Sequence, residues 1–97
     1  MIKITYRIEK NTASIRIKGH ALFARPGKDI VCAGVSTIFY TLVHSTQCKW
    51  LKKWRKQVLY SDYMTEAQKA RFDMAITGFE LLKESYPRHV SVKKIEN

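Results

Sequence analysis

Two stretches near the N-terminus alternate apolar and polar residues. The apolar positions fall on every second residue: Ile2, Ile4, Tyr6 and Ile8 in the first stretch, and Ala13, Ile15 and Ile17 in the second. The sequence EKNT between them, at residues 9–12, is turn-prone. A period of two is typical of strands with one buried face. We therefore expect a β-hairpin that ends at Gly19 and His20.

Two longer segments place apolar residues at the helical spacing of three and four. In the first segment they are Val31, Val35, Ile38, Phe39, Leu42 and Val43, and in the second Phe72, Ala75, Phe79, Leu82 and Tyr86. Asp29 is the natural N-cap of the first helix. Thr65 and Gln68 form a capping box at the start of the second helix, which Pro87 ends. Gly34 in a helix interior costs about 1 kcal/mol relative to alanine, so we expect close packing against it.

The remaining patterned segments are short. Residues 89–95 alternate again and predict a closing strand, whereas residues 57–60 fit either a short strand or the frayed end of the first helix. The order ββα(β)αβ indicates an α+β fold, with a small antiparallel sheet covered by two helices. With 97 residues, 45% of them hydrophobic, the chain can build one core but not two. We expect a single domain over residues 1–97.

The charge balance is strongly basic, with a formal net charge of +10. An anionic partner is therefore expected. The N-terminal sequence MIKITYRIEKN lacks the apolar run of a secretory signal. The uncharged segment Ile30–Cys48 contains too many hydroxyl and amide side chains for a membrane span. We expect a cytoplasmic protein that makes no membrane contact.

Cys32 and His20 are the strongest candidates for catalysis. Cys32 falls in the first turn of the predicted helix, where unpaired backbone N–H groups favour a thiolate, the nucleophilic form of cysteine. His20 stands where a strand gives way to a loop, a usual place for a functional side chain. Its imidazole can take the thiol proton and return it to a leaving amine, while the helical N–H groups hold an oxyanion. This is acyl-transfer chemistry, most simply peptide hydrolysis.

The same residues also fit a purely structural role. A cysteine in an amphipathic helix is usually a small buried apolar residue, and Asp29 can act as a cap alone. On a continuous helix, His44 lies about 18 Å and Cys48 about 24 Å from Cys32, too far for contact. His89 stays a candidate for orienting the site. The scattered cysteines and histidines lack the spacing of a zinc site, and no nucleotide-binding fingerprint is present, so we expect neither metal nor cofactor.

Three sequence motifs resemble those of one protein family. They are GHA at residues 19–21, G-x-DIVCA-x-VS at residues 27–36 and LLKESYPRHVSV at residues 81–92. Together with the hairpin before them, they resemble the ribosomal-processing cysteine proteases, the Prp family. The resemblance covers most of the chain and leaves residues 48–64 poorly matched.

The resemblance implies an activity and a set of roles. The family removes a short N-terminal extension, ending in aromatic residues, from large-subunit ribosomal protein twenty-seven. By resemblance, His20 is the base and Cys32 the nucleophile. Asp29 and Ser36 fall on motif positions as well, which implies supporting roles. Family members form homodimers and close a mobile loop over the peptide, here residues 21–28, which implies substrate contacts for Ala21, Leu22, Phe23 and Gly27.

The charge of the chain bears on the substrate. A ribosomal protein is itself basic, so an enzyme with a net charge of +10 is repelled by it in free solution. The substrate is then either already bound to RNA or another protein, such as a phage structural protein.

A basic segment that carries tryptophans supports a different function. Spacings of i, i+3, i+4 and i+7 put four lysines on one face of a helix: Lys49, Lys52, Lys53 and Lys56. Trp50 and Trp54 then lie one turn apart on another face. This pattern predicts a phosphate-binding ridge with indoles for base stacking, in an RNA-binding or ribosome-associated module without catalysis. Alternatively, the tryptophans extend the core and the lysines are solvated above it.

Overall fold

The computed structural model describes residues 1–19, 30–53 and 56–96 of the chain. Within these ranges the elements are β1 Ile2–Ile8, β2 Ala13–Lys18, α1 Ile30–Ser45, β3 Lys49–Lys53, β4 Lys56–Ser61, α2 Glu66–Ser85 and β5 Val90–Lys94. Residues 57–60, which fit either a strand or a frayed helix by sequence, are part of β4. No helix in the described ranges is long and apolar enough to cross a membrane.

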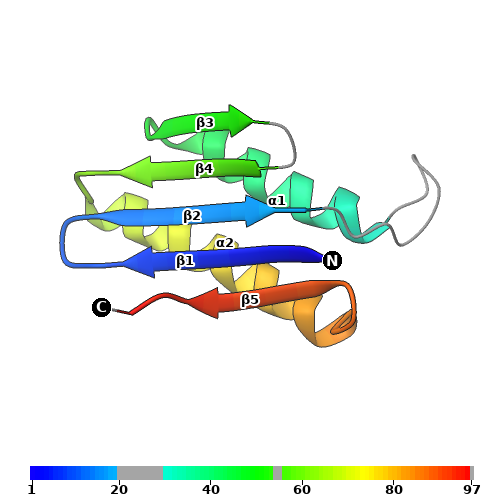
Figure 1. Ribbon diagram of the computed structural model, residues 1–97. Coiled ribbons are helices and arrows are strands. Elements are labelled where there is room, and N and C mark those ends of the chain that lie inside the picture. The colour runs from blue at the N-terminus through cyan, green and yellow to red at the C-terminus, as the bar shows by residue number, and fades with distance from the viewer. Residues whose placement is uncertain (20–29, 54–55, 97) are drawn as a thin grey trace.

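The strands form one sheet in the order β3-β4-β2-β1-β5, and both helices lie against the same face of it (Figure 1). The predicted α+β fold with two covering helices is confirmed. The strand pairs are antiparallel as expected, except that β1 and β5 run parallel. This pair is parallel because α2 returns the chain to the end of the sheet where β1 begins. There the Ile2 N–H donates a hydrogen bond to the His89 carbonyl (2.9 Å).

The alternation predicted for the hairpin builds the core between the sheet and the helices. The strand residues that are at most 2% exposed are Ile2, Ile4, Ala13, Ile15, Leu59 and Val90. They pack against the rings of Phe39 from α1 and of Phe72 and Phe79 from α2. The buried apolar side chains therefore come from all the layers that the sequence pattern indicates.

The ends of α2 and its contact with α1 follow the sequence signals. The Thr65 hydroxyl accepts a hydrogen bond from the Gln68 N–H (3.1 Å), which confirms the N-cap. The Tyr86 N–H donates to the Leu82 carbonyl (2.8 Å) where the helix ends. A Cβ added to Gly34 would lie 3.2 Å from Leu82 Cδ2, which confirms that the two helices approach closely at this glycine.

The predicted helical ridge of lysines is wrong. Helix α1 ends at Ser45, and the lysine-rich segment forms β3 and the start of β4. Successive residues of a strand point to opposite faces, so the lysines do not share one side. Lys52 lies on the helix-facing side with its register partner Gln57, whereas Lys49 and Lys53 lie on the opposite side. Lys56, the partner of Lys53, shares that opposite side.

Candidate active site

The first turns of α1, the end of β2 and the β3–β4 hairpin surround a groove of about 490 Å³. Helix α1 lines it with Cys32, Val35, Ser36 and Tyr40, and the sheet with Ile2, Ile17, Gly19, Lys52, Lys53, Lys56 and Gln57. We refer to this site as the Cys32 groove. Its lining combines apolar side chains, one thiol and three lysines, so it can hold an extended ligand with both apolar and polar groups.

Cys32 is the third residue of α1 and is half-buried. It packs against the core and also lines the groove. The N–H groups of the first helical turn have no acceptor within the helix, and they favour negative charge nearby. A thiol in this position suits nucleophilic attack on a carbonyl whose oxygen becomes an anion.

Ser36 and Tyr40 follow Cys32 on the same face of α1, one and two helical turns further on. All three residues line the groove, so it extends along about 12 Å of the helix axis. The structure therefore places Ser36 beside the same groove as Cys32, as the helical spacing predicts. An extended peptide rises about 3.3 Å per residue, so this length accommodates three or four residues.

A cluster of aromatic and amide side chains lies at the Tyr40 end of the groove. The Trp50 indole N–H donates to Gln57 Oε1 (3.0 Å), and Gln57 Nε2 donates to the Tyr40 hydroxyl (3.2 Å). The rings of Tyr40 and Trp50 meet edge to face, with centroids 5.8 Å apart. Lys52 Nζ lies 5.9 Å from the centroid of the Tyr40 ring. These contacts fix Tyr40 and leave Lys52 at the wall of the groove.

Sequence reasoning missed Tyr40 and Gln57 as site residues. The available signal for Tyr40 was its position eight residues after Cys32, on the same helical face. Gln57 gave no such signal because it reaches the groove only through the pairing of β4 with β2. Trp50 packs at this end of the groove, whereas Trp54 lies outside the described residues.

The end of β2 brings Gly19 to the groove. Its φ is 91°, and a Cβ added there would lie 2.5 Å from the Met1 carbonyl oxygen, so this close approach requires glycine. His20 follows Gly19 in the sequence and lies outside the described residues, as does Asp29. The same holds for the predicted substrate loop: Ala21, Leu22, Phe23 and Gly27.

The remaining sequence candidates are His44, Cys48 and His89. His44 is in the last turn of α1, about 18 Å from Cys32 along the helix, and its ring centroid lies 6.3 Å from that of Trp50. Cys48 follows the end of α1, and His89 precedes β5. Within the described ranges, no group of three or more histidine, cysteine or acidic side chains is placed to hold a metal ion.

Sequence comparison matches nearly the whole chain to one family model. That model is described as cysteine protease Prp and matches residues 1–91. A curated relative, the ribosomal processing cysteine protease Prp of Mycoplasma pneumoniae, is 58% identical over 40 residues. The match covers 41% of this chain and 36% of the relative, so the chain spans only about a third of that relative's length.

Solved structures share the fold around this groove. A ribosomal processing protease Prp from S. aureus, in complex with a covalently linked product peptide, superposes with a TM-score of 0.85 at 18% identity, covering 98% of this chain and 100% of the other. The protein SMU.848 from Streptococcus mutans superposes with a TM-score of 0.76 at 28% identity, covering 100% and 96%. By the match of residues 1–91 to its model, the chain belongs to the cysteine protease Prp family.

Proposed function

We propose that the protein is a cysteine endopeptidase in which Cys32 is the nucleophile and His20 is the base. One observation carries the proposal. Cys32 lies in the first turn of α1 and lines a peptide-sized groove together with Gly19, the residue that precedes His20 in the sequence. A nucleophile and its base must approach within hydrogen-bonding distance, and this arrangement brings the two chain segments to one groove.

The chemistry is acyl transfer in two steps. The Cys32 thiolate attacks the scissile carbonyl, the C–N bond breaks, and His20 gives its proton to the leaving amine, which leaves a thioester. Water, deprotonated by His20, then attacks the thioester and releases the carboxylate and the thiol. The N–H groups at the start of α1 stabilise the oxyanion in both steps. By their motif positions, Asp29 and Ser36 have supporting roles, Ser36 from one turn further along α1.

The proposed substrate is a ribosomal protein. The protein removes a short N-terminal extension from large-subunit ribosomal protein twenty-seven, with the peptide lying along α1 from Cys32 towards Tyr40. The resemblance of the motifs and the names of the relatives support this substrate. The family resemblance supports contacts of residues 21–28 with the peptide, and the protein works in the cytoplasm as a homodimer.

Cleavage of a synthetic peptide tests the proposal. The substrate carries an extension that ends in Phe-Phe, and mass spectrometry locates the cut. We expect cleavage to disappear with Cys32→Ala and to fall about 10²- to 10⁴-fold with His20→Ala, because the base and the acid for the leaving amine are lost. Cys48→Ala and His44→Ala are matched controls that keep most of the activity. Undiminished cleavage by folded Cys32→Ala would end the assignment, and equal losses in His44→Ala and His20→Ala would show that the base is misassigned.

A further inference from the structure

The face of the sheet that points away from the helices is covered by no described helix or strand, and it faces the viewer in Figure 1. Side chains alternate along each strand, and the buried ones, such as Ile4 and Ile15, face the helices. The cationic residues at the opposite positions are Lys3, Arg7, Arg16, Lys18, Lys49, Lys53, Lys56 and Lys93. We call these eight residues the basic face. The described strands contain no aspartate or glutamate to balance them.

Four of these lysines stand directly opposite one another on adjacent strands. The register pairs Lys3 of β1 with Lys18 of β2, Lys18 with Lys56 of β4, and Lys56 with Lys53 of β3. Neighbouring strands are about 4.8 Å apart, so the lysine row spans about 14 Å. Like charges directly opposite each other destabilise a sheet. This arrangement lowers the stability of the free protein, and a bound polyanion would reverse that effect.

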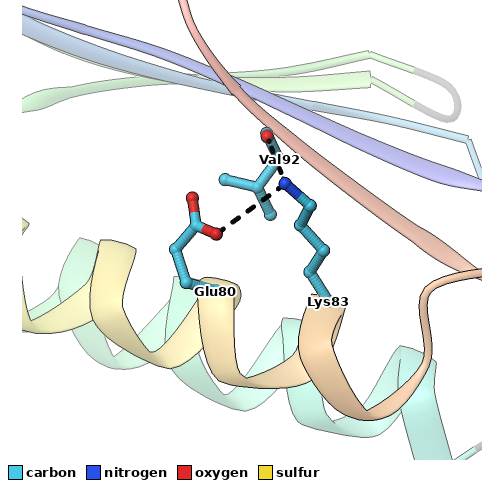
Figure 2. A network of polar contacts seen from close by, with 3 residues as sticks. All are labelled: Glu80, Lys83 and Val92. Atoms are coloured by element: carbon cyan, nitrogen blue, oxygen red, sulfur yellow. Dashed lines mark hydrogen bonds and ion pairs between the residues drawn. The ribbon is translucent and has the colours of Figure 1, made fainter.

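Four of the seven described acidic residues lie on the other side of the sheet, on helix α2: Glu66, Asp73, Glu80 and Glu84. The other three, Glu9, Asp62 and Glu96, lie just beyond the ends of strands. Lys83 Nζ lies 3.9 Å from Glu80 Oε2 and donates a hydrogen bond to the Val92 carbonyl (3.4 Å), beneath β5 (Figure 2). Acidic and basic groups are therefore mixed on the helical layer. Among the described residues, the excess positive charge is concentrated on the open side of the sheet.

We propose that the basic face binds the phosphate backbone of single-stranded RNA. The lysine row places a cation about every 4.8 Å across the strands, which offers a phosphate chain several contacts in that direction. Along the strands the cations are further apart, at about 6.7 Å for Arg16 and Lys18 and about 13 Å for Lys3 and Arg7. Tyr60 is 39% exposed on this face and presents a ring for base stacking. Ser14 and Ser91 lie between the cations, and their hydroxyls can pair with the ribose 2′-OH.

Other occupants fit the basic face less well. A second copy of the chain would set eight cations against eight cations, which is strongly repulsive. A membrane surface also attracts cations, but stable insertion needs a cluster of large apolar side chains. Among the outward positions of the described strands, Leu51 is the one large aliphatic side chain that is well exposed, at 67%. Single-stranded RNA uses the charge, the aromatic ring and the hydroxyls together.

Binding of a labelled RNA by fluorescence anisotropy tests the inference. The probe is a fluorescein-labelled 20-nucleotide RNA of mixed sequence, titrated with the full chain at several salt concentrations between 50 and 200 mM. The test variant replaces the lysine row with glutamine: Lys3, Lys18, Lys53 and Lys56. The matched control removes the same number of charges elsewhere by glutamine at Lys10, Lys69, Arg71 and Arg88. Melting temperatures show that both variants fold, and the row variant should melt no lower than the wild type because cross-strand repulsion is relieved.

We expect the row variant to lose at least tenfold in affinity, and its salt slope to fall by about 3, as the loss of four phosphate contacts to a single strand requires. The control should lose less than threefold. Equal losses in both variants would mean that net charge alone attracts RNA, and absence of binding at 50 mM salt would overturn the proposal. A poly-glutamate peptide that binds as tightly as RNA would reassign the basic face to an acidic protein. Because the assay does not depend on Cys32, its result stands apart from the proposed peptidase activity.

Discussion

Replacing Gly19 by alanine perturbs the backbone that holds the edge of the Cys32 groove. A residue other than glycine at a φ of 91° costs about 1–3 kcal/mol. The new Cβ would also lie 2.5 Å from the Met1 carbonyl oxygen, closer than the 3.0 Å below which real Cβ contacts essentially do not occur. Because that neighbour is backbone, either the start of β1 or the end of β2 must move. We expect a loss of at least about 2 kcal/mol in the free energy of unfolding.

For a domain of this size, about 1 kcal/mol shifts Tm by roughly 4–8 °C, so Gly19→Ala should melt roughly 8–16 °C below the wild type by circular dichroism. Peptide cleavage should fall as well, since Ile2 and Gly19 both line the groove. Gly34→Ala is the matched control. Its Cβ would meet the Leu82 side chain, which can shift, and alanine gains about 1 kcal/mol in helix propensity, so Tm should stay within about 4 °C. A Gly19→Ala variant that melts within about 2 °C of the wild type would refute the close approach at Met1.

Two further predictions concern the helix starts. Brief iodoacetamide treatment at pH 6.5, followed by peptide mapping, should modify Cys32 before Cys48. Both thiols are half-buried, so the position of Cys32 at a helix N-terminus, and not solvent access, decides the order. Equal labelling rates, or faster labelling of Cys48, would contradict this prediction. Thr65→Ala should lower the free energy of unfolding by about 1 kcal/mol and Tm by roughly 4–8 °C, because the Gln68 N–H loses its acceptor. Thr65→Ser keeps the hydroxyl and is the matched control. Equal Tm values for the two variants would show that the cap contributes nothing to stability.

The sequence predicts those elements that bury one face. The strands β1, β2 and β5 and both helices each contribute one face to a shared core, so their apolar residues recur with a period of two or of three to four. The edge strand β3 shows no periodic apolar pattern, because all five of its residues are exposed. The helical spacing of its lysines is then a coincidence of composition. The parallel pairing of β5 with β1 also leaves no local signal, because it depends on where α2 returns the chain.

The sequence predicts which site residues lie together on one helix, but not which residues from different elements meet. Helical spacing is enough to place Ser36 beside Cys32, because both belong to α1. The contact of Tyr40 with Gln57 joins residues 17 apart and requires the β3–β4 hairpin to pair with β2, which no local pattern specifies. The roles proposed for His20 and Asp29 rest on the family motifs and the chemistry of the groove, since both residues lie outside the described ranges.

The basic face and the Cys32 groove share two residues, Lys53 and Lys56. These two lysines contribute to the repulsion between a chain of net charge +10 and a basic ribosomal protein. RNA bound across the basic face would neutralise the lysines at the edge of the groove, and the field that repels a basic peptide would weaken there first. A substrate that arrives on RNA would thus meet a less cationic groove than one that is free in solution. The two proposals are therefore physically compatible: the charge that opposes binding of the free substrate is the charge that holds the RNA.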